Sequence, residues 1–526
     1  MVRRFGPFAA ALVASLALVT FAVVGGSGAG AVVTGTEDWT VYHGDPTGSG
    51  VAAGSVLSTP HAVWTSPDLD GQLYGEPLIF NGSVFAATEN DTVVALSAST
   101  GQVQWQQHLA TPVPASDLPC GDIKPTVGIT GTPVIDPSRS EIFVVADELV
   151  NGSPSHHLVG LSTSNGSVLT DQVVDPPAVN TAAILQRTGL TLDAGQVVFG
   201  YGGNYGDCSS YHGWVMAAPE GGGAARSYES DSASGQSQGA IWMGGAAPVV
   251  DAAGNIWVGV GNGSVTSAGA PYDHSDAVLE LSSSLSLLAY FAPSEWNEDN
   301  ADDLDLGSSA PALVGSDLAF QAGKSGIGYV LDRQALGGVG GQKASRGGVC
   351  NGEVAGGDAV SGTTVYVPCA TGVTAVSIAP TGTSLSVAWH TSSGSPGPPI
   401  LVGGVLFTIN QSGTLFGLNP STGATVEQFA LGPVANHFPT PAFGEGLLLA
   451  PSADQVHAFA AAATTPSTPP TSAVEHPHAR ATTTTTPHGQ GAGGGGWPVW
   501  ATITLLVGVA AALLGIVTWR RRRRPQ

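Results

Sequence analysis

Positive charge is scarce in this 526-residue sequence, which has 16 Lys and Arg residues against 39 Asp and Glu. Two of the Arg residues, Arg3 and Arg4, stand at the N-terminus and five form the run 520–524. The intervening part therefore has nine Lys and Arg against 39 acids, a net charge of −30. Such a balance argues against nucleic acid as a partner and favours cations or high solubility.

Sustained helical periodicity is also missing between the two ends of the chain, whereas Gly (74 residues) and Pro (36 residues) are abundant. Short apolar runs bounded by Gly and Asp, such as 196–201, 255–260 and 363–367, are typical of strands. Many tight turns between short strands indicate an all-β chain rather than a helical one.

A degenerate repeat shows how these strands are organised. The segment 92–105 (TVVALSASTGQVQW) reads as a strand, a tight turn at Ser99–Gly101 and a second strand ending in Trp. Residues 419–429 repeat it, and residues 161–169 repeat it more loosely. Upstream of it recurs a residue, usually small, followed by Pro at the start of an apolar strand; the Pro positions are 77, 133, 248, 311 and 441. Repeats of 40–60 residues indicate a radial or solenoid architecture.

The spacing of the Pro positions predicts eight units. The wide gaps leave room for further units that start near 186–192, Glu353 and Pro399. The last unit, 440–460, is too short for four strands, and residues 61–66 (HAVWTS) can supply its outer strand. Such a joint closes the ring and leaves no open sheet edge. We therefore predict an eight-bladed β-propeller over residues 32–460, closed by an N-terminal strand.

The two ends predict an extracellular, membrane-anchored protein. Arg3, Arg4, an apolar run and the A-x-A site at 29–31 predict a signal peptide over residues 1–31, with an uncleaved anchor as the alternative. Residues 461–496, rich in Thr, Pro and Gly, predict a disordered stalk. Residues 497–519 lack charge and predict one transmembrane helix, followed by a cytoplasmic Arg-rich tail at 520–526. The expected location is the cell membrane, as a single-pass type I protein.

Cysteine is limited to four residues: Cys120, Cys208, Cys350 and Cys369. Their even number in an exported chain predicts two disulfides, for which three pairings exist. Cys350–Cys369, within one blade, is the first choice. The spacing does not suit a zinc site, and the absence of a C-x-x-C-H motif excludes attached haem c.

The repeat Ala95-Leu96, Thr100-Gly101, Trp105 resembles that of the pyrroloquinoline-quinone (PQQ) propeller superfamily over roughly residues 39–459. This superfamily includes quinoprotein alcohol dehydrogenases and the non-enzymatic outer-membrane assembly factor BamB. The resemblance implies the eight-bladed ring already predicted from the spacing.

The resemblance to the dehydrogenases implies particular site residues. Residues 259–262 (GVGN) are similar to the segment whose Asn binds calcium, here Asn262, and residues 204–215 to the segment that carries a calcium-binding acid, here Asp207. Residues 323–333 match the strand whose basic residue contacts the quinone, here Lys324. Trp242 stands near the position of the Trp that forms the floor of that site.

Departures from the dehydrogenase pattern weaken the enzyme hypothesis. Asn297 stands where the family has its catalytic Asp, and an amide cannot accept a proton; Asp303 or Asp305 would have to act as the base. The family's adjacent Cys–Cys pair is absent. We therefore expect a binding or scaffold propeller for a small ligand, a glycan or a surface protein. The alternative is a calcium- and PQQ-dependent dehydrogenase of an alcohol or a polymer.

Other motifs have ordinary interpretations. The acidic segment 297–305 could present oxygen ligands to calcium but reads as a solvated loop. The G-x-S-x-G match at 235–239 lacks the strand and helix of a nucleophile elbow. His156, His157 and His212 show no ligand spacing and are expected to be loop or core residues, and the three His of the stalk are expected to be solvated.

Overall fold

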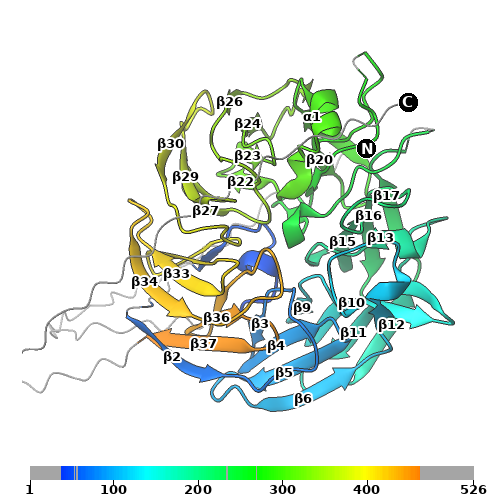
Figure 1. Cartoon of the computed structure of the whole chain (residues 1–526), viewed down its shortest axis with the longest axis vertical. Helices are drawn as coiled ribbons and strands as arrows, with labels where there is room; N and C mark the ends of the chain where they lie inside the picture. Colours follow the sequence, from blue (N-terminus) through cyan, green and yellow to red (C-terminus); the bar gives the residue numbers. More distant parts are fainter. Residues whose placement is uncertain are drawn as a thin grey trace, which may run out of the picture. The chain divides into compact units, whose positions relative to one another are not determined.

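The computed structural model describes residues 37–461, apart from residues 53, 55, 56, 58, 233, 234 and 268. Their strands form eight antiparallel sheets arranged around a central channel (Figure 1). In each sheet the first strand lies nearest the channel and the last strand lies at the rim. The predicted all-β, eight-bladed propeller is therefore confirmed.

We number the blades 1 to 8 in the order in which their first strands occur in the chain. Blades 1 to 4 consist of β3 (Leu78–Phe80), β4 (Ser83–Thr88), β5 (Thr92–Ser97) and β6 (Val103–His108); β9 (Val134–Asp136), β10 (Glu141–Val150), β11 (Ser153–Ser162) and β12 (Val168–Val173); β14 (Thr191–Asp193), β15 (Gln196–Gly203), β16 (Trp214–Pro219) and β17 (Arg226–Glu229); and β18 (Val249–Val250), β19 (Ile256–Val260), β20 (Ala277–Leu281) and β21 (Leu287–Ala292).

Blades 5 to 8 consist of β22 (Ala312–Val314), β23 (Leu318–Ala322), β24 (Gly328–Asp332) and β26 (Ala344–Arg346); β27 (Ala359–Ser361), β28 (Thr364–Cys369), β29 (Gly372–Ile378) and β30 (Leu385–His390); β31 (Ile400–Val402), β32 (Val405–Ile409), β33 (Thr414–Leu418) and β34 (Thr425–Ala430); and β35 (Ala442–Gly444), β36 (Leu447–Pro451), β37 (Val456–Ala461) and β2 (Pro60–Thr65).

The remaining elements decorate this ring. Three short strands extend a blade and two form a separate pair: β1 (Val51–Ala52) on β31, β13 (Ile184–Leu185) on β15, β25 (Gly338–Val339) on β21, and β7 (Val113–Pro114) with β8 (Thr126–Val127). One α-helix, α1 (Trp296–Asp302), and five 3₁₀ turns complete the described part: η1 (Tyr42–Gly44), η2 (Ala115–Asp117), η3 (Thr181–Ala183), η4 (Met243–Gly245) and η5 (Leu306–Ser308).

Ring closure follows the prediction from the sequence. Strand β2 pairs antiparallel with β37 and forms the outer strand of blade 8, so the last blade contains residues from both ends of the ring (Figure 1). Each complete blade thus has a neighbour on both sides. Strand β37 reaches Ala461, one residue beyond the predicted end of the propeller.

The recurring Trp and Gly of the repeat contact each other across blade boundaries. The indole of Trp105 on β6 donates a hydrogen bond to the carbonyl of Thr163 (3.0 Å) in the β11–β12 turn of blade 2. A Cβ at Gly166 in that turn would lie 2.5 Å from the same ring. Trp64 with Gly101, and Trp389 with Gly423, repeat this arrangement. We call each such pair a Trp–Gly clasp; it explains why Trp and Gly recur together.

An N-terminal segment, residues 37–50, occupies the central channel (dark blue in Figure 1). Its backbone carbonyls accept hydrogen bonds from the first strands of several blades, including Ile135 of blade 2, Val250 of blade 4 and Val360 of blade 6. Glu76, at the entry to blade 1, accepts hydrogen bonds from the indole of Trp39 (2.5 Å) and the amide of His43 (3.0 Å). We call residues 37–50 the channel plug. No pattern in the sequence predicted this segment.

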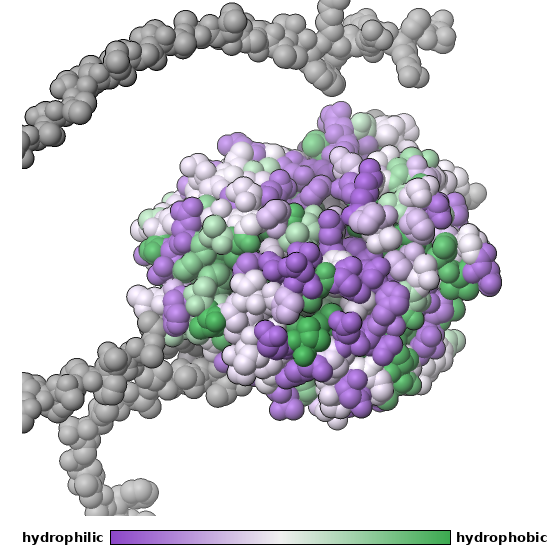
Figure 2. Space-filling view, turned by 60° about the horizontal axis from the view of Figure 1, so that its bottom comes forward, coloured by the Kyte–Doolittle hydropathy of each residue, from purple (hydrophilic) through white to green (hydrophobic). Residues whose placement is uncertain are grey.

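The surface of the ring is mixed in polarity. In Figure 2 hydrophilic residues cover much of the visible face, and hydrophobic residues form small separate groups. Several of the exposed large apolar side chains belong to outer strands, among them Val103, Leu169, Leu288 and Val426.

Two details differ from the expectations. The acidic segment 297–305 is not a solvated loop, because its residues 297–302 belong to α1 and the side chains of Asp299, Asn300 and Asp305 are buried. Blade 6 starts at Ala359, six residues after the predicted Glu353, since residues 353–358 belong to the connection that precedes β27.

The predicted signal peptide (1–31), transmembrane helix (497–519) and tail (520–526) lie outside the described residues, as does the predicted stalk (461–496) apart from Ala461, which belongs to β37. Within the described part of the chain, no helix has the length and apolar character needed to span a membrane.

Candidate ligand-binding site

A cavity of about 650 Å³ lies on one face of the ring. Much of its wall comes from loops that follow the second strand of a blade and from residues that precede a first strand, for example Asn262 after β19 and Trp242 before β18. In an antiparallel blade these two kinds of connection leave the sheet at the same end. The fold therefore collects them on one face, which we call the funnel.

The funnel brings together all six residues that the resemblance predicted as a site. They come from five connections between consecutive strands and are Asp207, Trp242, Asn262, Asp303, Asp305 and Lys324. Their roles as base, quinone contact or metal ligand stay predictions, whereas their proximity is a property of the fold.

Lys324 is the centre of this group. Its ammonium lies 2.6 Å from a carboxylate oxygen of Asp305 and 3.0 Å from one of Asp303. It also lies 5.7 Å from the centre of the Trp242 ring, within the range of a cation–π contact. Burial lowers the pKa of Lys324, but Asp305 and Asp303 outweigh this effect and raise it. The ammonium therefore stays charged at neutral pH.

Asp305 is held from two sides. Its second carboxylate oxygen accepts a hydrogen bond from the backbone amide of Asn262 at 2.6 Å. A Cβ at position 261 would lie 2.5 Å from that oxygen, so only Gly261 allows the approach. The Gly-Asn pair recognised in the sequence thus positions a carboxylate through backbone contacts.

The two remaining acids of the predicted set, Asp207 and Asp303, are both exposed. Asp207 accepts a hydrogen bond from the hydroxyl of Tyr211 at 2.7 Å. The side chain of Asp303 is 69% exposed and stands at the mouth of the funnel. Asp305 is the buried partner of Lys324, and Asp303 is the solvent-facing one.

Several funnel residues were missed by sequence reasoning, above all Arg187. Its guanidinium donates a hydrogen bond to Asn436 (2.9 Å), whose amide in turn donates to the carbonyl of Tyr74 (2.6 Å). Arg187 also lies over the Tyr74 ring at 6.0 Å. The available signal was its place just before the first strand of blade 3, because such positions converge on the axis of the ring.

A disulfide ties two loops of the funnel rim. Cys120 bonds to Cys208, and the nearby residues Asp122 and Asp207 line the cavity. The second disulfide, Cys350–Cys369, is the pairing favoured from the sequence. All four cysteines are thus paired, as predicted.

The funnel is acidic and aromatic. Five carboxylates line it, against the two permanent cations Lys324 and Arg187, and five aromatic rings contribute to its wall; these residues are Asp122, Asp207, Asp303, Asp305 and Glu353, and Tyr74, Tyr205, Tyr211, Trp242 and Phe438. Burial raises the pKa of Glu353, and Lys324 opposes that shift. The excess of carboxylates favours a ligand that brings positive charge.

The quinone and calcium implied by the dehydrogenases do not fit this lining well. PQQ carries three carboxylates, and the two cations that could meet them face five acids, two of which already pair with Lys324. Calcium needs six to eight oxygen ligands. Among the described residues, the funnel acids do not form a group of three whose donor atoms lie within 4.8 Å of one another.

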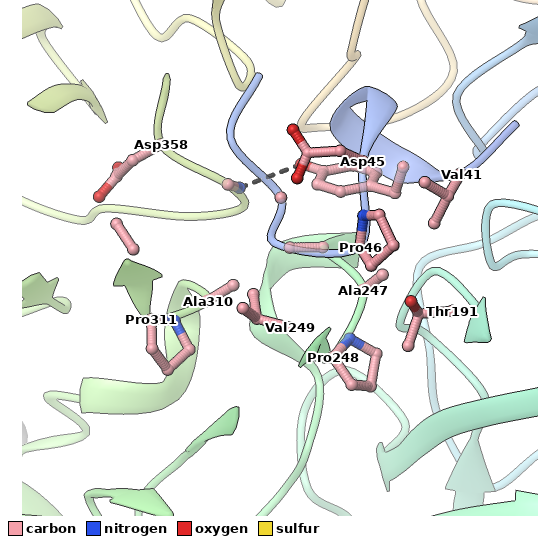
Figure 3. Close-up of a pocket in the computed structure, with 15 residues that line it drawn as sticks. Val41, Asp45, Pro46, Thr191, Ala247, Pro248, Val249, Ala310, Pro311 and Asp358 are labelled. Atoms are coloured by element: carbon pink, nitrogen blue, oxygen red, sulfur yellow. Dashed lines mark hydrogen bonds between the residues drawn. The ribbon is translucent and has the colours of Figure 1, made fainter. Parts of the chain in front are cut away.

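A second, much smaller gap lies between the channel plug and blades 3 to 6 (Figure 3). Val41, Asp45 and Pro46 of the plug face Pro248 and Pro311 there, and the amide of Gly357 donates a hydrogen bond to Tyr42. Its volume of about 10 Å³ suits a single water rather than a ligand. The small residue before each Pro, Ala247 or Ala310, packs at this wall, which gives the recurring small-residue–Pro marker a physical reason.

Comparison with known proteins supports the fold assignment. A family model described as outer membrane protein assembly factor BamB matches residues 23–257. No curated protein matches the sequence. The quinohemoprotein alcohol dehydrogenase from Comamonas testosteroni is similar in structure, with a TM-score of 0.61, 14% identity and 83% of each chain covered.

Two further solved structures are similar at comparable identity. A europium-containing methanol dehydrogenase has a TM-score of 0.59 and 13% identity, with 81% of this chain and 98% of that one covered. BamB from Moraxella catarrhalis has a TM-score of 0.50 and 14% identity, with 77% and 98% covered. At such identities the likeness concerns the fold and not the activity. Together with the repeats, these matches show that the chain shares the eight-bladed fold of these proteins.

Proposed function

We propose that this chain is a ligand-binding propeller displayed on the outer side of a membrane, and that its funnel receives a small organic cation. The single observation that carries the proposal is the composition of the funnel wall, in which carboxylates outnumber cations five to two beside aromatic rings. Carboxylates and aromatic faces together attract ammonium groups.

The site already holds one ammonium in this way. Lys324 contacts Asp303 and Asp305 while it lies over Trp242. A ligand amine would meet the other carboxylates, those of Asp122, Asp207 and Glu353, in the same cavity. The predicted signal peptide, stalk and transmembrane helix support display at the cell surface, with the funnel open to extracellular ligands.

The test is a titration of the purified full-length chain with spermidine, in which calorimetry and tryptophan fluorescence detect binding. We expect saturable binding that weakens at high salt, since the attraction is electrostatic. Glu353→Gln should lower the affinity about tenfold, which is one charge contact of about 1.4 kcal/mol. Glu427→Gln, on the exposed outer strand β34, is the matched control and should leave binding unchanged.

PQQ with calcium is the competing ligand in the same assay. Stoichiometric, calcium-dependent binding of PQQ, with no binding of spermidine, would overturn the proposal. That result would instead support the alternative dehydrogenase, which the gathering of the six predicted positions in one cavity favours. Failure of both ligands to bind would also contradict a cation-binding funnel.

A further inference from the structure

Outside the funnel wall, three potential metal ligands from blade 3 lie close together. The Nδ1 atom of His212 lies 3.0 Å from a carboxylate oxygen of Asp231 and 3.1 Å from one of Glu229. Among the described residues, these three form a group of His, Cys, Asp or Glu side chains whose donor atoms all lie within 4.8 Å of one another. From the sequence, His212 was expected to be an ordinary residue.

One of the three ligands has an unused, buried donor. The Asp231 side chain is fully buried, and its second carboxylate oxygen has no hydrogen-bond partner. A buried carboxylate without full compensation is costly, and a bound cation would remove that cost.

The backbone holds the ligands in a fixed arrangement. The hydroxyl of Ser230, the residue before Asp231, donates to the carbonyls of Gly213 (3.2 Å) and Gly239 (2.6 Å). Because Gly213 follows His212, these contacts tie the segment that carries Asp231 to the segment that carries His212. Glu229 is paired with Trp214 in the β16–β17 ladder. Metal sites of high affinity need ligands that are held in place by such outer contacts.

We propose that His212, Glu229 and Asp231 form a binding site for a divalent first-row transition-metal ion. One imidazole and two carboxylates suit zinc or manganese, because imidazole is a poor ligand for calcium and magnesium. Metal–ligand bonds of about 2.0–2.2 Å place neighbouring donor atoms about 2.8–3.1 Å apart in octahedral and about 3.3–3.6 Å apart in tetrahedral geometry, so the two observed separations need little or no adjustment to hold an ion.

One side of the proposed metal site is open to solvent, and another side is linked to the funnel wall. His212 and Glu229 are 33% and 28% exposed, so water completes the coordination of the ion. Tyr211 precedes His212, and the carbonyl of Asn262 accepts a hydrogen bond from Gly239, so the ion stabilises the part of the funnel wall that carries these two residues. Its expected role is structural.

The experiment measures metal bound to the purified full-length chain after dialysis against Zn²⁺, with Ca²⁺ as the comparison. The chain carries His476→Gln, His478→Gln and His488→Gln, so that the stalk contributes no imidazole. We expect one equivalent of Zn²⁺ and a higher melting temperature, with neither effect from Ca²⁺. Asp231→Asn and His212→Gln should each lower the affinity at least about tenfold.

The control is His157→Gln, which should leave Zn²⁺ binding unchanged. His157 also has two carboxylate neighbours, Asp171 at 2.8 Å and Glu148 at 3.9 Å, but the three do not form a convergent group. Absence of bound Zn²⁺ in the parent chain would overturn the proposal. Unchanged binding in a folded Asp231→Asn chain, checked by circular dichroism, would overturn it as well.

Discussion

Two lysine–aspartate pairs show how burial changes the contribution of an ion pair to stability. Lys324 and Asp305 form an ion pair with the lysine 21% and the aspartate 6% exposed, whereas Lys343 and Asp332 form a similar pair at 30% and 32% exposure. Removal of one partner is costly only where the other is left buried. The sequence shows both pairs as ordinary charges.

Lys324→Met should therefore lower the free energy of unfolding by about 3 kcal/mol, since it leaves the Asp305 carboxylate buried and unpaired. Lys343→Met should cost less than about 1 kcal/mol, as exposed pairs do. Urea denaturation of both variants measures the difference. Adding Asp305→Asn to Lys324→Met should recover part of the loss; equal costs for the two single variants would contradict this account.

His43 in the channel plug should make stability depend on pH. Burial lowers its pKa to about 4, and its two ring nitrogens lack hydrogen-bond partners. Below about pH 6.5 the unfolded chain therefore binds a proton at His43, whereas the folded chain does not bind it until the pH approaches 4. This contribution to stability is complete above pH 6.5 and is lost as the pH falls towards 4, by up to about 1.4 kcal/mol per pH unit.

The measurement is urea unfolding of the parent chain and of His43→Asn between pH 7 and pH 4. Asn tolerates the left-handed backbone of this position, where φ is 58°. The variant should lose stability more slowly than the parent as the pH falls, while the exposed His61→Asn should follow the parent curve. Parallel curves for His43→Asn and the parent would contradict the prediction.

At the scale of the element, the Trp–Gly clasp joins one blade to the next. The Gly of the turn serves two purposes, a positive φ and the close approach of an indole ring from the neighbouring blade. Gly82 has a similar φ of 75° but no atom within 4 Å of its missing Cβ. Gly82 and Gly101 lie in two turns of blade 1. Alanine at these two positions therefore distinguishes the cost of backbone strain from the cost of a clash with the indole ring.

Gly82→Ala should cost about 1 kcal/mol through strain alone. Gly101→Ala should cost at least about 2 kcal/mol more, because the new methyl group displaces Trp64 and its hydrogen bond to the carbonyl of Ala98. Thermal unfolding of the two variants provides the comparison. If both lost the same stability, the clasp would not contribute to the cohesion of the ring.

At the scale of the whole molecule, closure depends on contacts between residues distant in sequence. Strand β2 pairs with β37, the plug contacts first strands around the channel, and Cys120 is joined to Cys208 across 88 residues. The other disulfide spans only 19 residues. In the chain-entropy description, the longer loop loses more unfolded-state freedom.

Cys120→Ala with Cys208→Ala should therefore destabilise the chain by about 4 kcal/mol, and Cys350→Ala with Cys369→Ala by about 3 kcal/mol. Both are measured by urea unfolding under non-reducing conditions. The first pair of substitutions should also weaken ligand binding in the funnel, since it frees the loops that carry Asp122 and Asp207. A larger loss from the shorter loop would contradict the entropic account.

Several individual residues of the candidate site were predictable from the sequence, but the burial and the charge balance of the funnel wall were not. The resemblance picked out Asp207, Asn262 and Lys324, and all three line the funnel. Arg187, Glu353 and the Asp231 cluster were missed, because their relation to the site comes from blades that are far apart in sequence or from a turn with no ligand spacing.

The sequence by itself determined the all-β class, the eight units and the strand that closes the ring, whereas it only favoured Cys350–Cys369 among three possible pairings. These properties follow from local periodicity and repeat spacing, which a linear chain records. Only the tertiary structure decided that residues 37–50 fill the channel, that Asp305 is buried against Lys324, and that acids outnumber cations in the funnel. The physical reason is that burial and charge balance arise when loops from different blades meet at one face.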